Sequence, residues 1–192
     1  IIEEYMEGNE LSIDAVIFND EITITGVADR IIEYPPYFVE TGHTMPSQLP
    51  ADLQNEACEV MKNGIRALGI TIGCAKGDIK LTKHGAMVGE IAARLSGGFM
   101  SAYTYPLSSG VDLMKAAIEV ALGTEPGNLE AIRRRVSIER AIICKPGIVR
   151  KICGLEDAYK IPGIAEIFIN VKQGDRVVTP KSNVEKAGHI IA

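Results

Sequence analysis

Alternating apolar and polar positions predict three antiparallel strands at the start of the chain. They are expected over residues 1–6, 11–18 and 22–32, joined by short turns into a meander. The stretch that follows, residues 33–50, is rich in Pro and aromatic residues and is predicted to be a loop.

Apolar residues at helical spacing predict two helices. The first is expected over residues 51–70, with Asp52 near its start. Its apolar face consists of Leu53, Ala57, Val60, Met61 and Ile65. The second is expected over 110–123, with Asp112 near its start.

The sequence pattern changes after a predicted hinge and short helical turn over residues 125–135. Short strands then alternate with Gly and Pro turns, which predicts a separate β-rich lobe. Strands followed by helices, with hairpins rather than repeated βαβ units, predict an α+β fold with an antiparallel sheet and packed helices. We expect domains at 1–130 and 131–192.

The segment between the two helices predicts a β-hairpin with a three-residue loop, Lys83–Gly85. A loop centred on His84 pairs residues equally distant from it, so Asp78 should lie directly opposite Glu90. Alternation then defines two faces. The core face is expected to carry Ile79, Leu81, Met87 and Ile91, and the polar face Asp78, Lys80, Thr82, Glu90, Ala92 and Arg94.

Two like charges opposite each other destabilise a sheet, so a positive group is expected near them. Oxygen ligands on a rigid hairpin suit magnesium, which takes one or two carboxylates and completes its shell with phosphate and water. Arg94 on the same face offers a bidentate fork for phosphate. The alternative is a solvated polar face on which Lys80 neutralises the pair.

Composition narrows the choice of partner. The 192 residues are 46% apolar and carry a net charge of −5, which argues against nucleic acid or an anionic membrane as the main partner. The four cysteines lack metal-binding spacing and indicate reduced, mostly buried thiols of a cytoplasmic protein. No signal peptide or membrane span is predicted. Because the chain begins and ends inside strand-like segments, we expect a piece of a larger protein.

The N-terminal residues "EEYMEGNE" resemble the adenine-binding segment of the ATP-grasp superfamily of carboxylate–amine ligases, in its L-amino acid ligase and carbamoyl-phosphate-synthase-like branch. The resemblance implies an ATP site in which Glu10 holds the ribose hydroxyls, a role that a carboxylate can fill. The implied adenine contacts are Glu3, Glu4, Tyr5 and Met6. A charged edge strand is the alternative for this segment.

The hairpin resembles the metal-binding strands of the same superfamily. The resemblance implies that Asp78 and Glu90 hold Mg²⁺ (or Mn²⁺) and that Arg94 contacts the γ-phosphate or an acyl phosphate. Ala92 stands where one branch has a metal-binding Asn, so phosphate and water would supply the other ligands. The "LSGG" that follows resembles a turn that lets the backbone approach the substrate, with an ordinary loop before a helix as the alternative.

Two further stretches carry the resemblance. "FVETGHTMPSQLP" implies that His43 contacts phosphate or the carboxylate substrate, although a loop histidine bonded to backbone remains an alternative. Residues 146–192 are similar to the small β lobe that follows the ATP-grasp core in L-amino acid ligase-like proteins. Of the other histidines, His84 is expected to be exposed, and no role is assigned to His189.

The resemblance implies an enzyme that activates a carboxylate as an acyl phosphate with Mg-ATP and then joins it to an amine. This chain would be its C-terminal half, inactive without the N-terminal half, and a homodimer is compatible. Small-molecule acids and amines are the expected partners. A biotin-carboxylase or carbamoyl-phosphate-synthase type of enzyme and a non-catalytic nucleotide-binding module are the alternatives.

Overall fold

The computed structural model describes residues 2–192, and the chain divides into two compact units. Unit 1 comprises the residues up to Arg30 together with 44–136, and unit 2 comprises 31–43 and 137–192. Residues 31–43 therefore group with the C-terminal residues, whereas the sequence placed them in the first domain. The boundary at residue 130 stays a prediction.

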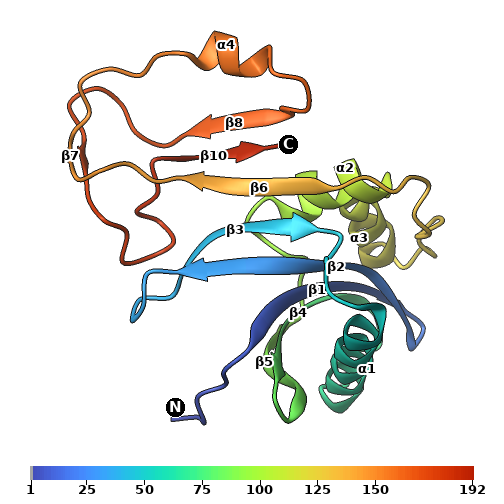
Figure 1. Ribbon diagram of the computed structural model, residues 1–192. Coiled ribbons are helices and arrows are strands. Elements are labelled where there is room, and N and C mark those ends of the chain that lie inside the picture. The colour runs from blue at the N-terminus through green and yellow to red at the C-terminus, as the bar shows by residue number, and fades with distance from the viewer. Residues whose placement is uncertain (1) are drawn as a thin grey trace. The chain divides into compact units, whose positions relative to one another are not determined.

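Unit 1 is built on four antiparallel strands in the order β5-β4-β1-β2 (Figure 1). Their bounds are β1 Asn9–Phe18, β2 Glu21–Glu33, β4 Gly73–Thr82 and β5 Gly85–Ala92, and the last three residues of β2 belong to unit 2. Helix α1, Ala51–Ala67, covers one face and buries Ala57, Met61 and Ile65 against the sheet, as its spacing predicted. These strands and this helix are confirmed.

The strand predicted for the first residues is wrong where the structure describes it. Residue 1 lies outside the described residues, and residues 2–7 contain no strand. Ile2 and Tyr5 are exposed, so the segment has no buried apolar face of the kind that fixes a strand.

Three helical elements follow β5: the π-helix η1 Met100–Thr104, α2 Tyr105–Ser109 and α3 Leu113–Ala121. They pack on the sheet face opposite α1, at the end of β1 that carries Val16. Helix α3 is confirmed, and the Asp112 side chain caps it by accepting from Lys115 N at 2.9 Å. Residues 125–135 contain no helix, so the predicted helical turn is wrong.

Unit 2 is rich in short strands. Their bounds are β3 Val39–Met45, which ends just inside unit 1, β6 Ser137–Ile142, β7 Gly147–Ile148, β8 Glu166–Ile169, β9 Arg176–Val177 and β10 Gly188–Ile191. Four of these strands lie side by side in the order β3-β6-β10-β8, and β7 pairs with β9. The short helix α4, Leu155–Tyr159, lies between β7 and β8 in sequence. The loop predicted over 33–50 is wrong at β3, where Val39, Thr41, His43 and Met45 are buried at strand spacing.

The observed elements confirm the α+β class, with an antiparallel sheet, packed helices and a β-rich lobe. Within residues 2–192, no helix combines the length and apolar character that crossing a membrane requires.

Candidate functional site

The sheet face of unit 1 opposite α1 changes from polar to apolar along β1. Val16 and Phe18 pack with the helical elements, whereas Glu10, Ser12 and Asp14 precede them on the same side. Together with side chains from the neighbouring strands, these form a surface that we call the polar half-face. It consists of Glu10, Ser12, Asp14, Arg30, Lys76, Asp78, Lys80 and Glu90.

Five charged side chains of this half-face form one connected network. Arg30 Nη1 pairs with Glu10 Oε1 and lies 2.9 Å from Asp78 Oδ1. Lys80 Nζ lies 2.9 Å from Glu10 Oε2, and Lys76 Nζ pairs with Asp78 Oδ2. Three cations thus face two carboxylates, with side chains 11–24% exposed. Because the surroundings are largely protein, these charges interact more strongly than surface pairs do.

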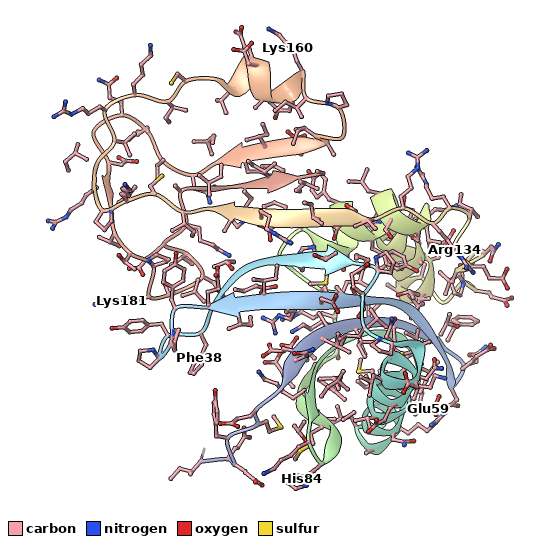
Figure 2. The ribbon with its side chains drawn as sticks, in the orientation of Figure 1. Phe38, Glu59, His84, Arg134, Lys160 and Lys181 are labelled. Carbon is pink, nitrogen blue, oxygen red and sulfur yellow. The ribbon has the colours of Figure 1, made fainter. Side chains whose placement is uncertain are left out.

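The hairpin places Asp78 directly opposite Glu90, as predicted. The loop, however, has only two residues, Lys83–His84, because Thr82 pairs with Gly85. The predicted three-residue loop is therefore wrong. His84 lies exposed at the tip of the hairpin, as expected (Figure 2).

A β-bulge at Gly89, an extra residue in β5, restores the register at the carboxylate pair. Between the turn and the bulge, side chains point to the face opposite the one predicted. Met87 pairs with Lys80, whereas Ala86 lies opposite Leu81 and packs in the core with α1. The placement of Met87 on the core face is wrong, because a shift of one residue sends each side chain to the other side.

The two carboxylates have different surroundings. Asp78 is paired with two cations, yet its buried Oδ1 accepts no well-directed hydrogen bond from residues 2–192. Glu90 is exposed, and its side chain makes no hydrogen bond or ion pair within that range. The alternative in which Lys80 neutralises this pair is wrong, since Lys80 pairs with Glu10.

This donor set fits a divalent cation such as Mg²⁺, because two opposed carboxylates retain unused oxygen lone pairs. No group of three or more His, Cys, Asp or Glu side chains among the described residues is arranged to hold a metal ion. A metal bound here would therefore take its remaining ligands from a bound nucleotide and from water.

Arg94 lies just beyond β5, on a turn that is tied to β1. Its side chain is exposed, and its Nη1 donates to Leu95 O at 3.0 Å. Two residues on, Ser96 donates to Asp14 Oδ1 from its backbone N at 2.9 Å and from its hydroxyl at 2.8 Å. The Ser101 hydroxyl lies 3.3 Å from Asp14 Oδ2. Asp14 thus anchors the turn that follows Arg94.

Asp14 is only 1% exposed, and sequence reasoning did not identify it. Burial raises its pKa above 3.8, although the hydrogen bonds from Ser96 and Ser101 and the charge of Lys76 oppose that rise. Its position before Val16 in an alternating strand was visible, but its partners lie more than 80 residues away in sequence.

The predicted adenine segment precedes β1 in unit 1. Glu3, Glu4 and Tyr5 are exposed, and Met6 is half-buried. A Cβ added at Gly89 would lie 3.8 Å from the Met6 methyl group, so Met6 approaches the bulge of β5. The segment thus borders the hairpin that carries the carboxylate pair, and its contacts with adenine remain a prediction.

His43 belongs to unit 2 and lies on β3 rather than in a loop, so that structural expectation is wrong. It is fully buried, and its Nδ1 lies 3.7 Å from Oε2 of Glu139 on β6. The other oxygen of Glu139 lies 2.5 Å from Nδ1 of His189 on β10. The sequence assigned His189 no role, whereas the structure places its Nδ1 in a buried contact with Glu139. Contact between His43 and a substrate remains a prediction.

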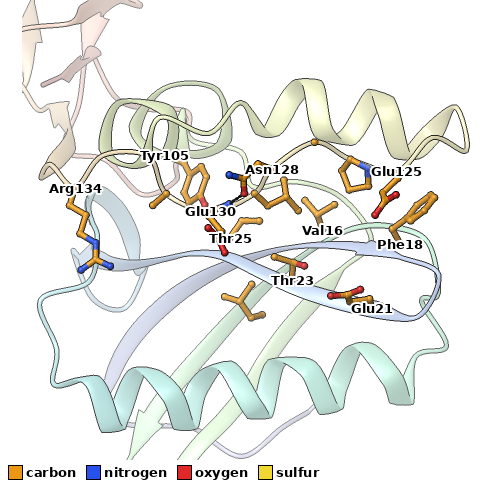
Figure 3. Close-up of a pocket in the computed structure, with 15 residues that line it drawn as sticks. Val16, Phe18, Glu21, Thr23, Thr25, Tyr105, Glu125, Asn128, Glu130 and Arg134 are labelled. Atoms are coloured by element: carbon orange, nitrogen blue, oxygen red, sulfur yellow. Dashed lines mark hydrogen bonds between the residues drawn. The ribbon is translucent and has the colours of Figure 1, made fainter.

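A cavity of about 920 Å³ lies at the apolar end of the same sheet face (Figure 3). Phe18, Thr25 and Tyr105 line it together with Arg134 and the segment 125–131. None of the predicted site residues borders it. Although its volume suits a small ligand, the polar half-face combines more directed charges, so we place the candidate site there.

All four cysteines are free thiols, but only Cys74 is buried, and Cys153 is exposed. The expectation of mostly buried thiols therefore holds for one cysteine and fails for Cys153. Burial raises the pKa of Cys74 to about 11, which leaves almost no thiolate at neutral pH.

Comparison with known proteins identifies the class that this fold and site define. The family model described as the ATP-grasp domain matches residues 1–103, more than half of the chain. The model described as L-amino acid ligase C-terminal domain 2 matches residues 140–192. The chain therefore belongs to the ATP-grasp family, and the predicted resemblance is confirmed.

Particular relatives extend this result. An uncharacterized protein of Sinorhizobium fredii is 29% identical over all of this chain, which spans 39% of that protein. Carnosine synthase 1 of Gallus gallus is 32% identical over 66% of this chain, which spans 13% of the synthase. The crystal structure of L-amino acid ligase from Bacillus licheniformis matches with a TM-score of 0.86 and 22% identity, over 98% of this chain and 49% of the ligase. The chain thus spans about half or less of these relatives, and the last likeness shows the fold alone.

Proposed function

We propose that this chain is part of an ATP-dependent ligase that activates a carboxylate and joins it to an amine. The observation that carries the proposal is the polar half-face, where the opposed carboxylates Asp78 and Glu90 adjoin a network with three cations. Membership of the ATP-grasp family supports a nucleotide as the ligand of this face. The names of the L-amino acid ligase and carnosine synthase relatives favour small acids and amines as substrates.

Each predicted residue has a role in this proposal. The backbone of Glu3, Glu4, Tyr5 and Met6 would bind the adenine edge, and Glu10 the ribose hydroxyls. Asp78 and Glu90 would hold Mg²⁺ or Mn²⁺, which would offset charge on the β- and γ-phosphate oxygens. Arg94 would stabilise the transferring phosphoryl group, and His43 would contact phosphate or the acid.

The proposed reaction has two balanced steps. A carboxylate oxygen of the acid attacks the γ-phosphorus of ATP, the bond to the β-phosphate oxygen breaks, and an acyl phosphate and ADP result. The amine nitrogen then attacks the acyl carbon, loses a proton and displaces inorganic phosphate. The chain would work with the N-terminal half of the same protein, in the cytoplasm, as a monomer or homodimer.

Two alternatives remain distinct from this proposal. A carboxylase or carbamoyl-phosphate type of enzyme would use bicarbonate as its acid, but the match of residues 140–192 to an L-amino acid ligase domain favours the ligase. A non-catalytic nucleotide-binding module would not need Asp78, Glu90 and Arg94 together, and all three are present.

The test is release of ADP by the full-length protein that carries this chain, with magnesium and a panel of amino acids and small acids. We expect substrate-dependent release that Glu90→Gln reduces by about 100-fold or more, because a group acting on transferring charge is lost. Glu90 is the better target because it is exposed and lacks a side-chain partner within residues 2–192, whereas Asp78→Asn would also disturb two ion pairs. Normal turnover in Glu90→Gln would contradict the metal assignment.

A further inference from the structure

Lys76 of β4 is a buried cation beside the carboxylate pair. It is only 8% exposed, and its Nζ pairs with Oδ2 of Asp78. Removing an ammonium from water is costly and needs a close anion in compensation. Asp78 already has a second cation, since Arg30 Nη1 lies 2.9 Å from its other oxygen. Arg30 is shared with Glu10, whereas Asp78 is the one carboxylate that forms an ion pair with Lys76 among residues 2–192.

The neighbouring strands explain why Lys76 reaches along its own strand. In the strand register it lies between Asp14 of β1 and Ala92 of β5. The Ala92 side chain has no polar atom, and the Asp14 oxygens already accept hydrogen bonds from Ser96 and Ser101. The ammonium is therefore directed toward Asp78, two residues further along β4.

A metal ion held by Asp78 and Glu90 would compete with Lys76 for the same carboxylate. A nucleotide bound with that metal brings phosphate oxygens to the same surface, and these carry more negative charge than one divalent cation neutralises. They would provide the ammonium with a new anionic partner when the metal takes part of the Asp78 charge.

We propose that Lys76 exchanges Asp78 for a phosphate oxygen of the nucleotide and serves as a second cation of the phosphate site. This inference rests on the proposed function and adds to it a residue that the sequence did not single out. It predicts effects of opposite sign on metal and nucleotide, which a purely structural ion pair would not produce.

The experiment compares the full-length protein with its Lys76→Met variant in two binding measurements. Mn²⁺ affinity without nucleotide, followed by electron paramagnetic resonance, should tighten several-fold because a competing cation is gone. Affinity for a non-hydrolysable ATP analogue with Mg²⁺, measured by calorimetry, should weaken about tenfold because a charged phosphate contact is lost. Lys76→Arg, which keeps the charge, should retain most of the nucleotide affinity.

Lys115→Met is the matched control, since the same charge is removed from an exposed position on α3. We expect it to change neither affinity. If Lys76→Met does not fold, as judged by circular dichroism, Lys76→Gln takes its place with the same two expectations.

Three results would overturn the inference. Nucleotide affinity that the Lys76 variants leave unchanged, or that Lys76→Arg loses as fully as Lys76→Met, would show that the ammonium has no phosphate partner. Metal affinity that falls together with nucleotide affinity would show that Lys76 only maintains the site. A wild-type protein that binds no nucleotide would overturn the proposed function as well, whereas the first two results leave that function standing.

Discussion

Asp14 illustrates at the residue scale how one buried carboxylate can fix the turn that follows a strand. Its oxygens accept hydrogen bonds from Ser96 and Ser101, which follow Arg94 in the chain. The geometry of that turn depends on a strand far away in sequence. Because burial raises the pKa of Asp14, the folded state holds a proton more tightly than the unfolded state does.

This pKa predicts a pH-dependent difference between the wild type and Asp14→Asn. Between pH 3.8 and the raised pKa, the folded wild type retains a proton that the unfolded chain releases, so its stability falls as pH rises through that range. Asn does not titrate and keeps one acceptor oxygen for Ser96. Urea unfolding from about pH 4 to about pH 8 should show the variant gaining on the wild type as pH rises. A difference that stays constant with pH would contradict the prediction.

Sequence reasoning at this scale identified the carboxylates of the site but missed most of its cations. Asp78 and Glu90 could be paired because one hairpin contains both. Arg30 reaches Glu10 and Asp78 only after β1, β2 and β4 have assembled, and no local spacing encodes that contact. The buried pair of Glu139 and His189 is missed for the same reason, since 50 residues separate its members.

At the scale of elements, the two main helices of unit 1 begin in different ways. The Asp112 side chain caps α3 by accepting from Lys115 N. Helix α1 starts after Pro50 without any side-chain cap, although Asp52 lies in its first turn. A cap bond satisfies a backbone donor that would otherwise lack a partner, whereas an acid in the first turn acts only through the helix dipole.

This contrast predicts unequal costs for two similar substitutions. Asp112→Ala should destabilise the protein by about 1 kcal/mol, because it removes the cap. Asp52→Ala should cost only about 0.5 kcal/mol or less, because only the dipole interaction is lost. Chemical unfolding of both variants measures the difference, and equal costs would mean that the cap bond contributes nothing beyond charge.

The spacing of apolar residues predicted the long helices and strands well. It failed where nearby Pro, Gly or aromatic residues suggested a loop but the chain forms a strand or helix in the folded protein. Helix α1 and strands β1 and β2 have extended, regular patterns, and they are confirmed. Strand β3 was missed because Pro and aromatic residues before it suggested a loop, although its alternation was present. The π-helix η1 and α2 follow a Gly pair and contain Pro106, so no helical stripe was visible.

At the scale of the whole molecule, the described residues supply one charged sheet face for the proposed nucleotide site. The chain spans 49% of the L-amino acid ligase that it resembles in fold. In the proposed enzyme, the remaining contacts to the nucleotide would come from the other half. Affinity depends on burying and pairing a ligand from all sides. Half of a site is therefore expected to bind the nucleotide much more weakly than the complete site does.

We therefore predict that residues 1–192 alone bind ATP weakly and turn nothing over. Calorimetry with Mg-ATP should give a Kd of roughly 1 mM or weaker, with circular dichroism confirming that the isolated chain is folded. The full-length protein measured in parallel should bind much more tightly. A low-micromolar Kd for the isolated chain would show that these residues contain a complete site.

Because of the bulge at Gly89, the pairing of Asp78 with Glu90 does not depend on the length of the turn. Two arrangements of the same residues place Asp78 opposite Glu90: the observed two-residue turn with a bulge, and a three-residue turn without one. They differ only in which way residues 86–88 face, so exchanging one for the other would turn Met87 toward α1 and leave the carboxylates where they are. A change from one turn to the other would therefore end at Gly89 and leave the proposed metal ligands opposite each other.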